Sequence, residues 1–289
     1  MMKVESVALS FPCEGEQLIG VLSRPEVSRK TGLITVVAGG PQYRAGCGRQ
    51  LVELAQALSA IGVPVLRFDY RGMGESTGQY QGFQHIEADI AAAIAELKRQ
   101  VPEVEKIVLW GGCNAASACM INAWRFPEVS SLILGNPFVR SKALAEQVRK
   151  QHYLNRLRQG EFWRKLFTGK YRLSGYAREF CNAFVGRITN RFRSTRPGNG
   201  QGEDIPFQDK MFQGMQNFAG PCLFLISGRS LDSREFGILV KNSTEWQSLF
   251  YRDGNKHLFL PEADQTFSTR ASRETIISAA SEWVNRFQI

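Results

Sequence analysis

The chain has 289 residues, of which 43% are hydrophobic and 22% charged, a composition typical of a globular protein with one large domain or two smaller ones. Mean hydropathy is slightly negative (−0.23), and no apolar run reaches the roughly 18 residues that a membrane-spanning helix needs. The first residues lack the apolar stretch of a secretory signal, so a cytoplasmic location is predicted.

Charge and cysteine content narrow the functional classes. The formal net charge is +9, but residues 140–196 alone hold fifteen Lys or Arg and three Glu, so the rest of the chain is slightly acidic. Because no recognisable nucleic-acid-binding module accompanies this basic segment, binding to DNA or RNA is not predicted. Six cysteines without a C-x-x-C pair and three histidines leave almost no ligands for a zinc site, so neither a metal nor a cofactor is predicted.

Short apolar runs alternate with segments that can form helices. Two alternating strands come first, at Val4–Leu9 and Gln17–Ser23, as in an antiparallel pair at the edge of a sheet. Further strands are predicted at Leu33–Ala38, Val63–Asp69, Ile107–Gly111, Leu132–Gly135, Leu223–Ser227 and His257–Pro261, and helices at Arg49–Ala60, Ile86–Arg99, Asn114–Phe126 and Arg273–Phe287. The alternation predicts a doubly wound α/β fold, with a mostly parallel sheet covered by helices on both faces.

Residues 140–220 interrupt this alternation. They contain apolar residues near helical spacing, followed by a polar, Gly-rich stretch; the apolar residues are Leu154, Leu157, Phe162, Trp163, Leu166 and Phe167. We predict a core of residues 1–139 and 221–289, and a basic helical cap insertion at 140–220 with a flexible loop near 196–204. An insertion at this point of a doubly wound sheet would lie above the carboxyl ends of the strands, where ligands bind.

A candidate nucleophile follows the third parallel strand. Cys113 lies in Gly111-Gly112-Cys113-Asn114-Ala115, between an apolar strand and an Ala-rich helix, which is the layout of a nucleophile elbow with cysteine in place of serine. The start of the helix is expected to favour the thiolate. The alternative is a small buried cysteine at a tight strand–helix packing point, the kind of role expected for Cys119.

A glycine-rich turn follows the first parallel strand, with the sequence Gly39-Gly40-Pro41-Gln42. Hydrolases place one N–H of the oxyanion hole in such a turn. Because proline has no N–H, Gly40 or Gln42 would be the donor, together with the N–H of Asn114. A plain strand-to-loop turn is the alternative.

Four motifs together resemble one family. They are the elbow, the turn Gly-Gly-Pro-Gln-Tyr-Arg at 39–44, the run Arg-Phe-Asp-Tyr-Arg-Gly-Met-Gly at 67–74, and Glu-Phe-Trp-Arg-Lys-Leu-Phe-Thr-Gly at 161–169. Nearly the whole chain resembles the exosortase A system-associated hydrolase 1 family, within the α/β-hydrolases. The resemblance implies an α/β-hydrolase fold with a cysteine nucleophile. It also implies a cytoplasmic protein linked to bacterial exopolysaccharide production and protein sorting, with an unestablished substrate.

The sequence departs from that family at both partners of the nucleophile. Gln265 stands where the family has its histidine base, and Ser230 stands where it has its acid. Asp232 lies two residues further on and replaces the acid only if the loop repositions it. Glutamine cannot take a proton from a thiol, so acylation by an activated ester or thioester would survive while hydrolysis of the acyl group would fail or be slow.

The three histidines are poor replacements for the missing base. His257 begins the last predicted strand, eight residues before Gln265, which is too far along an extended chain. His85 is expected to have a capping or surface role. His152 belongs to the basic insertion and would approach the site only if that insertion folds over it.

Two functions from different classes remain open. The first is an acyl (ester or thioester) hydrolase or acyltransferase that uses Cys113 on a small-molecule substrate, with the basic insertion drawing anionic substrate groups. The second is a catalytically impaired homologue that serves as a binding or regulatory module. The basic and aromatic residues of the insertion also suggest weak contact with anionic lipid headgroups or a polyanionic polysaccharide, with an ordinary solvated helix face as the alternative.

Overall fold

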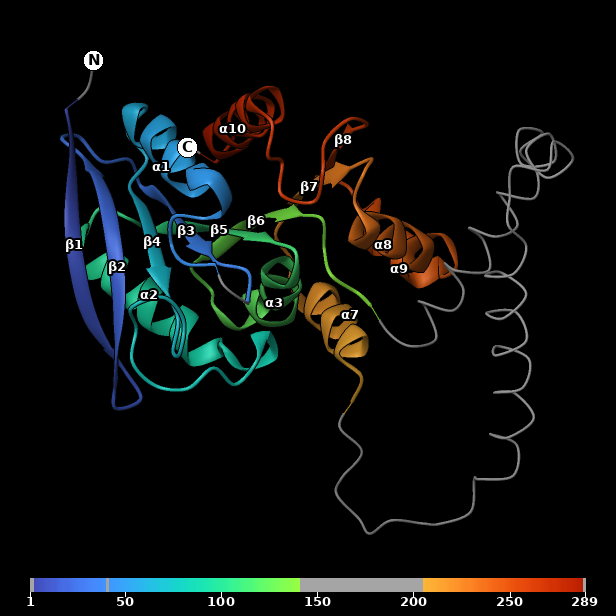
Figure 1. Ribbon diagram of the computed structural model, residues 1–289, viewed down its shortest axis with the longest axis horizontal. Coiled ribbons are helices and arrows are strands. Elements are labelled where there is room, and N and C mark those ends of the chain that lie inside the picture. The colour runs from blue at the N-terminus through green and yellow to red at the C-terminus, as the bar shows by residue number, and fades with distance from the viewer. Residues whose placement is uncertain (1–2, 40–41, 141–204, 288–289) are drawn as a thin grey trace, which may run out of the picture. The chain divides into compact units, whose positions relative to one another are not determined.

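The computed structural model describes residues 3–39, 42–140 and 205–287, so the helices and loop predicted for 154–167 and 196–204 lie outside the described residues. In the described part, eight strands form one sheet in the order β1-β2-β4-β3-β5-β6-β7-β8 (Figure 1). The strands are β1 (Val4–Cys13), β2 (Glu16–Pro25), β3 (Thr31–Val36), β4 (Val65–Asp69), β5 (Lys106–Gly112), β6 (Val129–Gly135), β7 (Cys222–Ser227) and β8 (Lys256–Leu260). The pairs β1·β2 and β2·β4 are antiparallel, and the remaining pairs are parallel.

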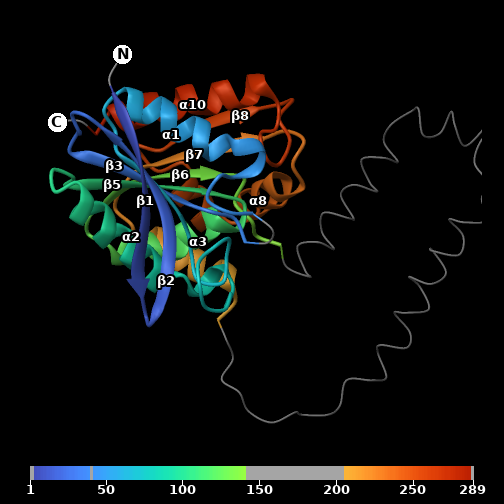
Figure 2. The ribbon, with the colours of Figure 1, turned by 60° about the vertical axis from the view of Figure 1, so that its left-hand side comes forward.

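Helices cover both faces of this sheet (Figures 1 and 2). One face carries α1 (Gln50–Ala60) and α10 (Arg270–Asn285), and the other carries α2 (Glu87–Gln100), α3 (Asn114–Asn122) and α7 (Phe207–Asn217). Between β7 and β8 the chain forms α8 (Leu231–Lys241) and α9 (Thr244–Phe250); the short 3-10 helices are η1 (Cys47–Arg49), η2 (Phe83–His85) and η3 (Ala123–Arg125). Because both faces are covered, β3 and β4 are buried along their whole length.

The doubly wound α/β architecture predicted from the sequence is confirmed, and the differences concern individual helices. The sequence reasoning missed α8 and α9; α8 mixes acidic, basic and apolar residues, and α9 has only seven residues. Helix α10 begins three residues earlier than predicted, because the Thr269 side chain accepts a hydrogen bond from the Ser272 N–H at 3.2 Å and caps the helix there. Helix α7 lies within the range predicted for the insertion, 140–220, and packs against α3, one of the helices that cover the sheet. The division of the chain into core and insertion stays a prediction.

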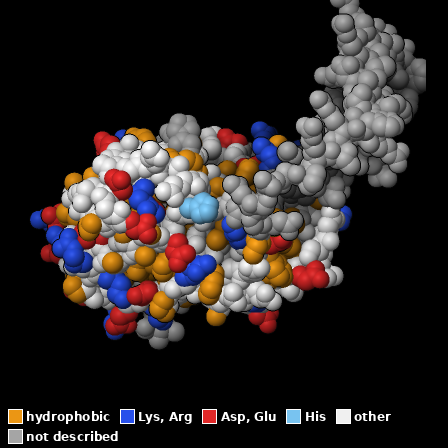
Figure 3. Space-filling view, turned by 90° about the horizontal axis from the view of Figure 1, so that it is seen from below, with side chains coloured by type: hydrophobic (Ala, Val, Ile, Leu, Met, Phe, Trp, Pro, Cys, Tyr) orange, Lys and Arg blue, Asp and Glu red, His pale blue; other side chains and the backbone are white. Residues whose placement is uncertain are grey.

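The described surface and helices bear on possible partners. None of the helices in the described ranges combines the length and apolar character needed to cross a membrane. On the face shown in Figure 3, acidic and basic side chains are interspersed among apolar ones. Within the same residues, His, Cys, Asp and Glu side chains form no group of three or more that could hold a metal ion.

Candidate active site

The chain turns sharply at Cys113, between the end of β5 and the start of α3. Its backbone has φ 55° and ψ −126°, a conformation that costs about 1–3 kcal/mol for a residue other than glycine. A Cβ on Gly111 would lie 2.5 Å from the Ala115 carbonyl oxygen, so only glycine allows the strand and helix to approach this closely. The Cys113 N–H donates to the Gly135 carbonyl at 2.8 Å, and its own carbonyl accepts from the Phe138 N–H at 3.3 Å. The turn therefore has the geometry of a nucleophile elbow.

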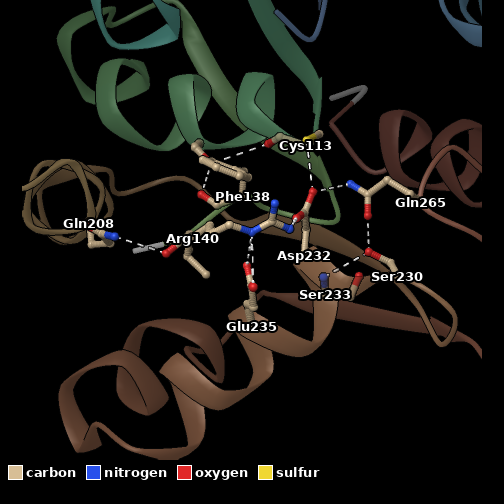
Figure 4. A network of polar contacts seen from close by, with 11 residues as sticks. Cys113, Phe138, Arg140, Gln208, Ser230, Asp232, Ser233, Glu235 and Gln265 are labelled. Atoms are coloured by element: carbon tan, nitrogen blue, oxygen red, sulfur yellow. Dashed lines mark hydrogen bonds and ion pairs between the residues drawn. The ribbon is translucent and has the colours of Figure 1, made fainter. Parts of the chain in front are cut away.

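The thiol of Cys113 contacts a carboxylate, whereas the nucleophile of a hydrolase normally contacts a base at this position. Cys113 Sγ donates to Asp232 Oδ2 at 3.2 Å (Figure 4). Asp232 lies in the first turn of α8, which begins here because Ser230 Oγ accepts a hydrogen bond from the Ser233 N–H at 3.1 Å. The cap therefore brings Asp232 to the site, where it contacts the nucleophile itself instead of orienting a histidine.

Gln265 lies between Ser230 and Asp232. Its Nε2 donates to Asp232 Oδ2 at 2.8 Å, and its Oε1 accepts a hydrogen bond from Ser230 Oγ. Its backbone carbonyl accepts from Asn136 Nδ2 at 2.9 Å, which fixes the turn after β8. The positions predicted for nucleophile, acid and base are thus brought together. The Gln265 amide binds Asp232 and lowers the pKa of the Cys113 thiol, but it has no basic group.

Arg140 and Glu235 belong to the same network, and the sequence reasoning missed both. Arg140 Nη2 lies 3.0 Å from Asp232 Oδ1, and its Nε lies 3.2 Å from Glu235 Oε2. The two carboxylates lie one turn apart on α8 and are buried, whereas the Arg140 side chain is 44% exposed. In the sequence Arg140 is one of fifteen basic residues in a basic segment, so nothing marks it as a site residue.

Asn136 is a second residue that the sequence reasoning missed. It is fully buried, and its Oδ1 accepts hydrogen bonds from the Ser227 N–H at 2.8 Å and from Ser233 Oγ at 2.6 Å. It adopts a left-handed conformation with φ 46°, which asparagine tolerates better than most residues. An Asn-Pro pair directly after a predicted strand is the signal that could have indicated such a turn.

Burial and Asp232 keep the Cys113 thiol protonated. Burial is the main cause that raises its pKa, followed by the charge of Asp232 and the hydrogen bond to that carboxylate, and together they bring it to about 12. The Asn114 N–H at the start of α3 lowers the pKa but is outweighed. The start of the helix thus favours the thiolate, as predicted, but burial and Asp232 have the larger opposite effect, and at neutral pH the sulfur is a hydrogen-bond donor.

We expect alkylation of Cys113 by iodoacetamide to rise about tenfold per pH unit between pH 8 and 10.5, without the plateau of an ordinary thiol, because only the thiolate reacts and the pKa is about 12. Asp232→Asn removes the second and third causes of the raised pKa, so the variant should react about tenfold faster at pH 8. Peptide mapping resolves Cys113 from the other cysteines. The exposed Asp253→Asn is the charge-matched control, and an equal rate in both variants would contradict the assignment.

The candidate oxyanion hole is described in part. The Asn114 N–H lowers the pKa of the Cys113 thiol, and the Asn114 side-chain Oδ1 accepts a hydrogen bond from the Gly39 N–H at 2.8 Å. Gln42 is partly buried and forms no hydrogen bond with described residues of the elbow. Gly40 lies outside the described residues, so its role as a donor stays a prediction.

The histidines that the structure describes make their contacts elsewhere. His257 Nε2 lies 2.8 Å from the Phe250 carbonyl oxygen, and its ring stacks on Phe224. His85 is exposed at the end of η2. Neither forms a hydrogen bond with Cys113 or Asp232, and His152 lies outside the described residues.

Three phenylalanines lie beside the elbow. Phe138, whose N–H bonds the Cys113 carbonyl, stacks on Phe207 of α7 with ring centroids 5.9 Å apart. Phe83 of η2 meets both rings edge-on, at 6.1 and 5.4 Å. Arg140 lies over the Phe138 ring, 5.7 Å from its centroid. The described part of the site thus combines a partly buried aromatic cluster with the polar network around the sulfur.

Comparison with known proteins agrees with this geometry at the level of the fold. The family described as serine aminopeptidase, S33 (Hydrolase_4), matches residues 40–172, a stretch that includes the elbow. No curated protein matches the sequence.

Solved structures match over almost the whole chain. An esterase of Pyrococcus furiosus has a TM-score of 0.64 at 17% sequence identity, and the match covers 99% of this chain and 92% of the esterase chain. Est1E of Butyrivibrio proteoclasticus, solved with ferulic acid bound, has a TM-score of 0.59 at 14% sequence identity, and the match covers 96% of this chain and 98% of the Est1E chain. A serine hydrolase without a lid from Xanthomonas campestris has a TM-score of 0.57 at 15% identity, covering 98% and 95%. With the strand order and the elbow, these likenesses establish an α/β-hydrolase fold.

Proposed function

We propose that this protein takes acyl groups from activated esters or thioesters onto Cys113 and passes them to water only slowly, acting as a weak hydrolase or as an acyltransferase. The observation that carries the proposal is the strained elbow, which holds Cys113 Sγ 3.2 Å from Asp232 Oδ2 while Gln265 occupies the position of the base. The esterase fold neighbour of Pyrococcus furiosus supports esters as one class of acyl donor.

Acylation uses Asp232 as a proton carrier. The S–H proton moves to Asp232 Oδ2 as the sulfur bonds to the carbonyl carbon, and the electrons of the C=O double bond move to the oxygen. When these electrons re-form the C=O double bond, the bond to the leaving alcohol or thiol breaks, and the leaving group takes the proton from Asp232. The products are an acyl thioester on Cys113, the free alcohol or thiol, and an ionised carboxylate.

The basicity of a carboxylate limits this reaction to activated donors. In model peptides, carboxyl groups have a pKa of about 4 and imidazole has a pKa of about 6.5, so a carboxylate is the weaker proton acceptor. The high pKa of the thiol widens that gap. Water attacking the acyl thioester would need the same help, and Gln265 cannot provide it, so the acyl group is expected to persist on Cys113.

The acyl group itself is expected to be apolar. The rings of Phe83, Phe138 and Phe207 lie beside the elbow, and such surface binds aliphatic or aromatic groups. Near the sulfur, the Asp232 and Glu235 carboxylates face the single guanidinium of Arg140, so an anionic group of the substrate would bind away from the sulfur. The basic segment 140–196 is the proposed place for that contact, and for contact with an anionic surface.

The family resemblance extends the proposal to a biological setting. The motifs favour a cytoplasmic bacterial protein associated with exosortase systems and exopolysaccharide production. The acyl acceptor would be sought among the molecules of such a system.

The alternative is a binding or regulatory module without turnover. The raised pKa of Cys113 and the amide at position 265 favour this alternative, because neither feature promotes attack on an ester. The two proposals differ in one observable property, the formation of a covalent acyl adduct on Cys113.

We expect intact-protein mass spectrometry to detect an adduct that persists on Cys113 after incubation with short-chain activated esters and thioesters, and none in Cys113→Ala. Asp232→Asn should slow this acylation at least tenfold while it speeds alkylation of the same sulfur, because only acylation needs a proton delivered to a leaving group. Faster acylation in Asp232→Asn would contradict the role of Asp232. A folded wild-type protein without any adduct across the panel would favour the binding module.

A further inference from the structure

The turn after β3 packs against two side chains at one glycine. A Cβ placed on Gly39 would lie 2.4 Å from Tyr80 Oη and 2.9 Å from Asn114 Nδ2. Only glycine therefore lets both polar groups approach this turn, which directly precedes the candidate oxyanion donor Gly40. The two side chains therefore converge on this turn, and Asn114 links the turn to the elbow because it directly follows Cys113 in sequence.

Among the described residues of this turn, the backbone offers few free donors. The Gly39 N–H is already bonded to Asn114 Oδ1 at 2.8 Å, and Pro41 has no N–H. Because a backbone N–H can only donate, this bond also fixes the orientation of the Asn114 amide, with its oxygen on Gly39 and its N–H groups left for other acceptors. An oxygen bound beside Cys113 thus meets a side-chain amide as well as the Asn114 N–H.

Tyr80 is held so that its hydroxyl hydrogen can face the site. Its ring packs against that of Tyr70, with centroids 5.9 Å apart. Tyr70 is 1% exposed, and burial together with the neighbouring Tyr80 raises its pKa far above the usual range, so Tyr70 stays protonated. The Tyr70 hydroxyl has no hydrogen-bond partner among the described residues, so it does not occupy the Tyr80 hydroxyl, whose hydrogen is available for an acceptor beside Gly39. Tyr80 is 42% exposed, so a ligand can reach it.

We propose that the Tyr80 hydroxyl and the Asn114 side-chain amide donate hydrogen bonds to the carbonyl oxygen of the acyl group that Cys113 attacks. As the sulfur bonds to the carbonyl carbon, electrons of the C=O bond move to this oxygen, and the two donors stabilise its charge without giving up their protons. This inference rests on the proposed acyl transfer and assigns two catalytic side chains to it.

Tyr80→Phe tests the inference, because it retains the ring contact with Tyr70 and removes only the donor. We expect acylation of Cys113 by an activated ester to slow about 10²-fold, the lower end of the effect of losing one oxyanion donor, since Tyr80 is partly exposed. Alkylation by iodoacetamide forms no oxyanion, so its rate at Cys113 should stay within twofold of wild type. Tyr251→Phe, which removes the hydroxyl of an exposed tyrosine after α9, is the matched control.

Asn114→Asp provides the second variant. Its side chain can still accept the hydrogen bond from the Gly39 N–H but has lost the amide donor and gained a negative charge, so acylation should slow at least as much as in Tyr80→Phe. Acylation of Tyr80→Phe at the wild-type rate, or a parallel loss of alkylation, would overturn the inference. Failure of the proposed function is distinct: wild-type protein would then be alkylated at Cys113 but not acylated.

Discussion

Gln265→His is expected to raise the rate at which the acyl group on Cys113 is hydrolysed by about 10²- to 10⁴-fold, the usual contribution of general-base catalysis. The side chain at this position already lies between two polar partners, with its Nε2 2.8 Å from Asp232 Oδ2 and its Oε1 on Ser230 Oγ. An imidazole there would have one nitrogen oriented by these groups and the other available for water. The backbone of the turn is held by Asn136, independently of the side chain.

The gain should depend on pH in a defined direction. Asp232 favours the protonated form of a neighbouring imidazole, and only the neutral form can accept a proton from water. Hydrolysis by Gln265→His should therefore increase as the pH rises above about 6.5, the ordinary pKa of histidine, whereas the wild-type protein should lack this step. The decay of a preformed acyl adduct, followed by intact mass between pH 6 and 9, measures both the gain and its pH dependence.

Gln265→Asn is the control, because it keeps an amide but is too short for both contacts. It should hydrolyse the adduct no faster than wild type. If Gln265→His decays at the same rate as Gln265→Asn, the persistence of the adduct has a cause other than the missing base, such as exclusion of water from the thioester.

The alternation of strands and helices along the chain and the position of the elbow could be predicted because both depend on local patterns. Short apolar runs separated by helical segments specify a parallel sheet, and Gly111, Cys113 and Ala115 combine small residues with a nucleophile at a strand–helix junction. The structure explains the pattern physically, since a side chain at Gly111 would collide with the Ala115 backbone. The fold class therefore follows from residues that are close in sequence.

The electrostatics of the site could not be predicted in the same way. The pKa of Cys113 is set by burial and by Asp232, which is 119 residues away and reaches the sulfur because Ser230 begins α8 where it does. Arg140 and Tyr80 likewise come from loops whose course the sequence pattern does not specify. Reasoning from the elbow alone accounts for the start of α3, which lowers the pKa of the thiol, but not for burial and the distant carboxylate, which raise it by more.

Arg140→Met is expected to destabilise the described core by about 3 kcal/mol, because it leaves two buried carboxylates without their cation. Asp232 and Glu235 lie one turn apart on α8 with side chains only 11% and 2% exposed, and both are paired with the same guanidinium. The loss should fall at the lower end of the range for buried ion pairs, since Arg140 itself is 44% exposed and water can reach the place that it leaves. Urea unfolding at pH 7.5 measures the change as a shift in midpoint at constant slope.

The double variant Arg140→Met/Glu235→Gln separates charge from packing. Removing one carboxylate should recover a large part of the lost stability, because a neutral amide at this depth carries no charge to repel Asp232. A single variant within 0.5 kcal/mol of wild type, or a double variant no more stable than the single one, would show that the ion pairs contribute little. If the recovery is observed, Arg140 is what allows helix α8 to hold two carboxylates side by side with Asp232 against the Cys113 sulfur, and the stability of the core and the chemistry of the thiol depend on the same guanidinium.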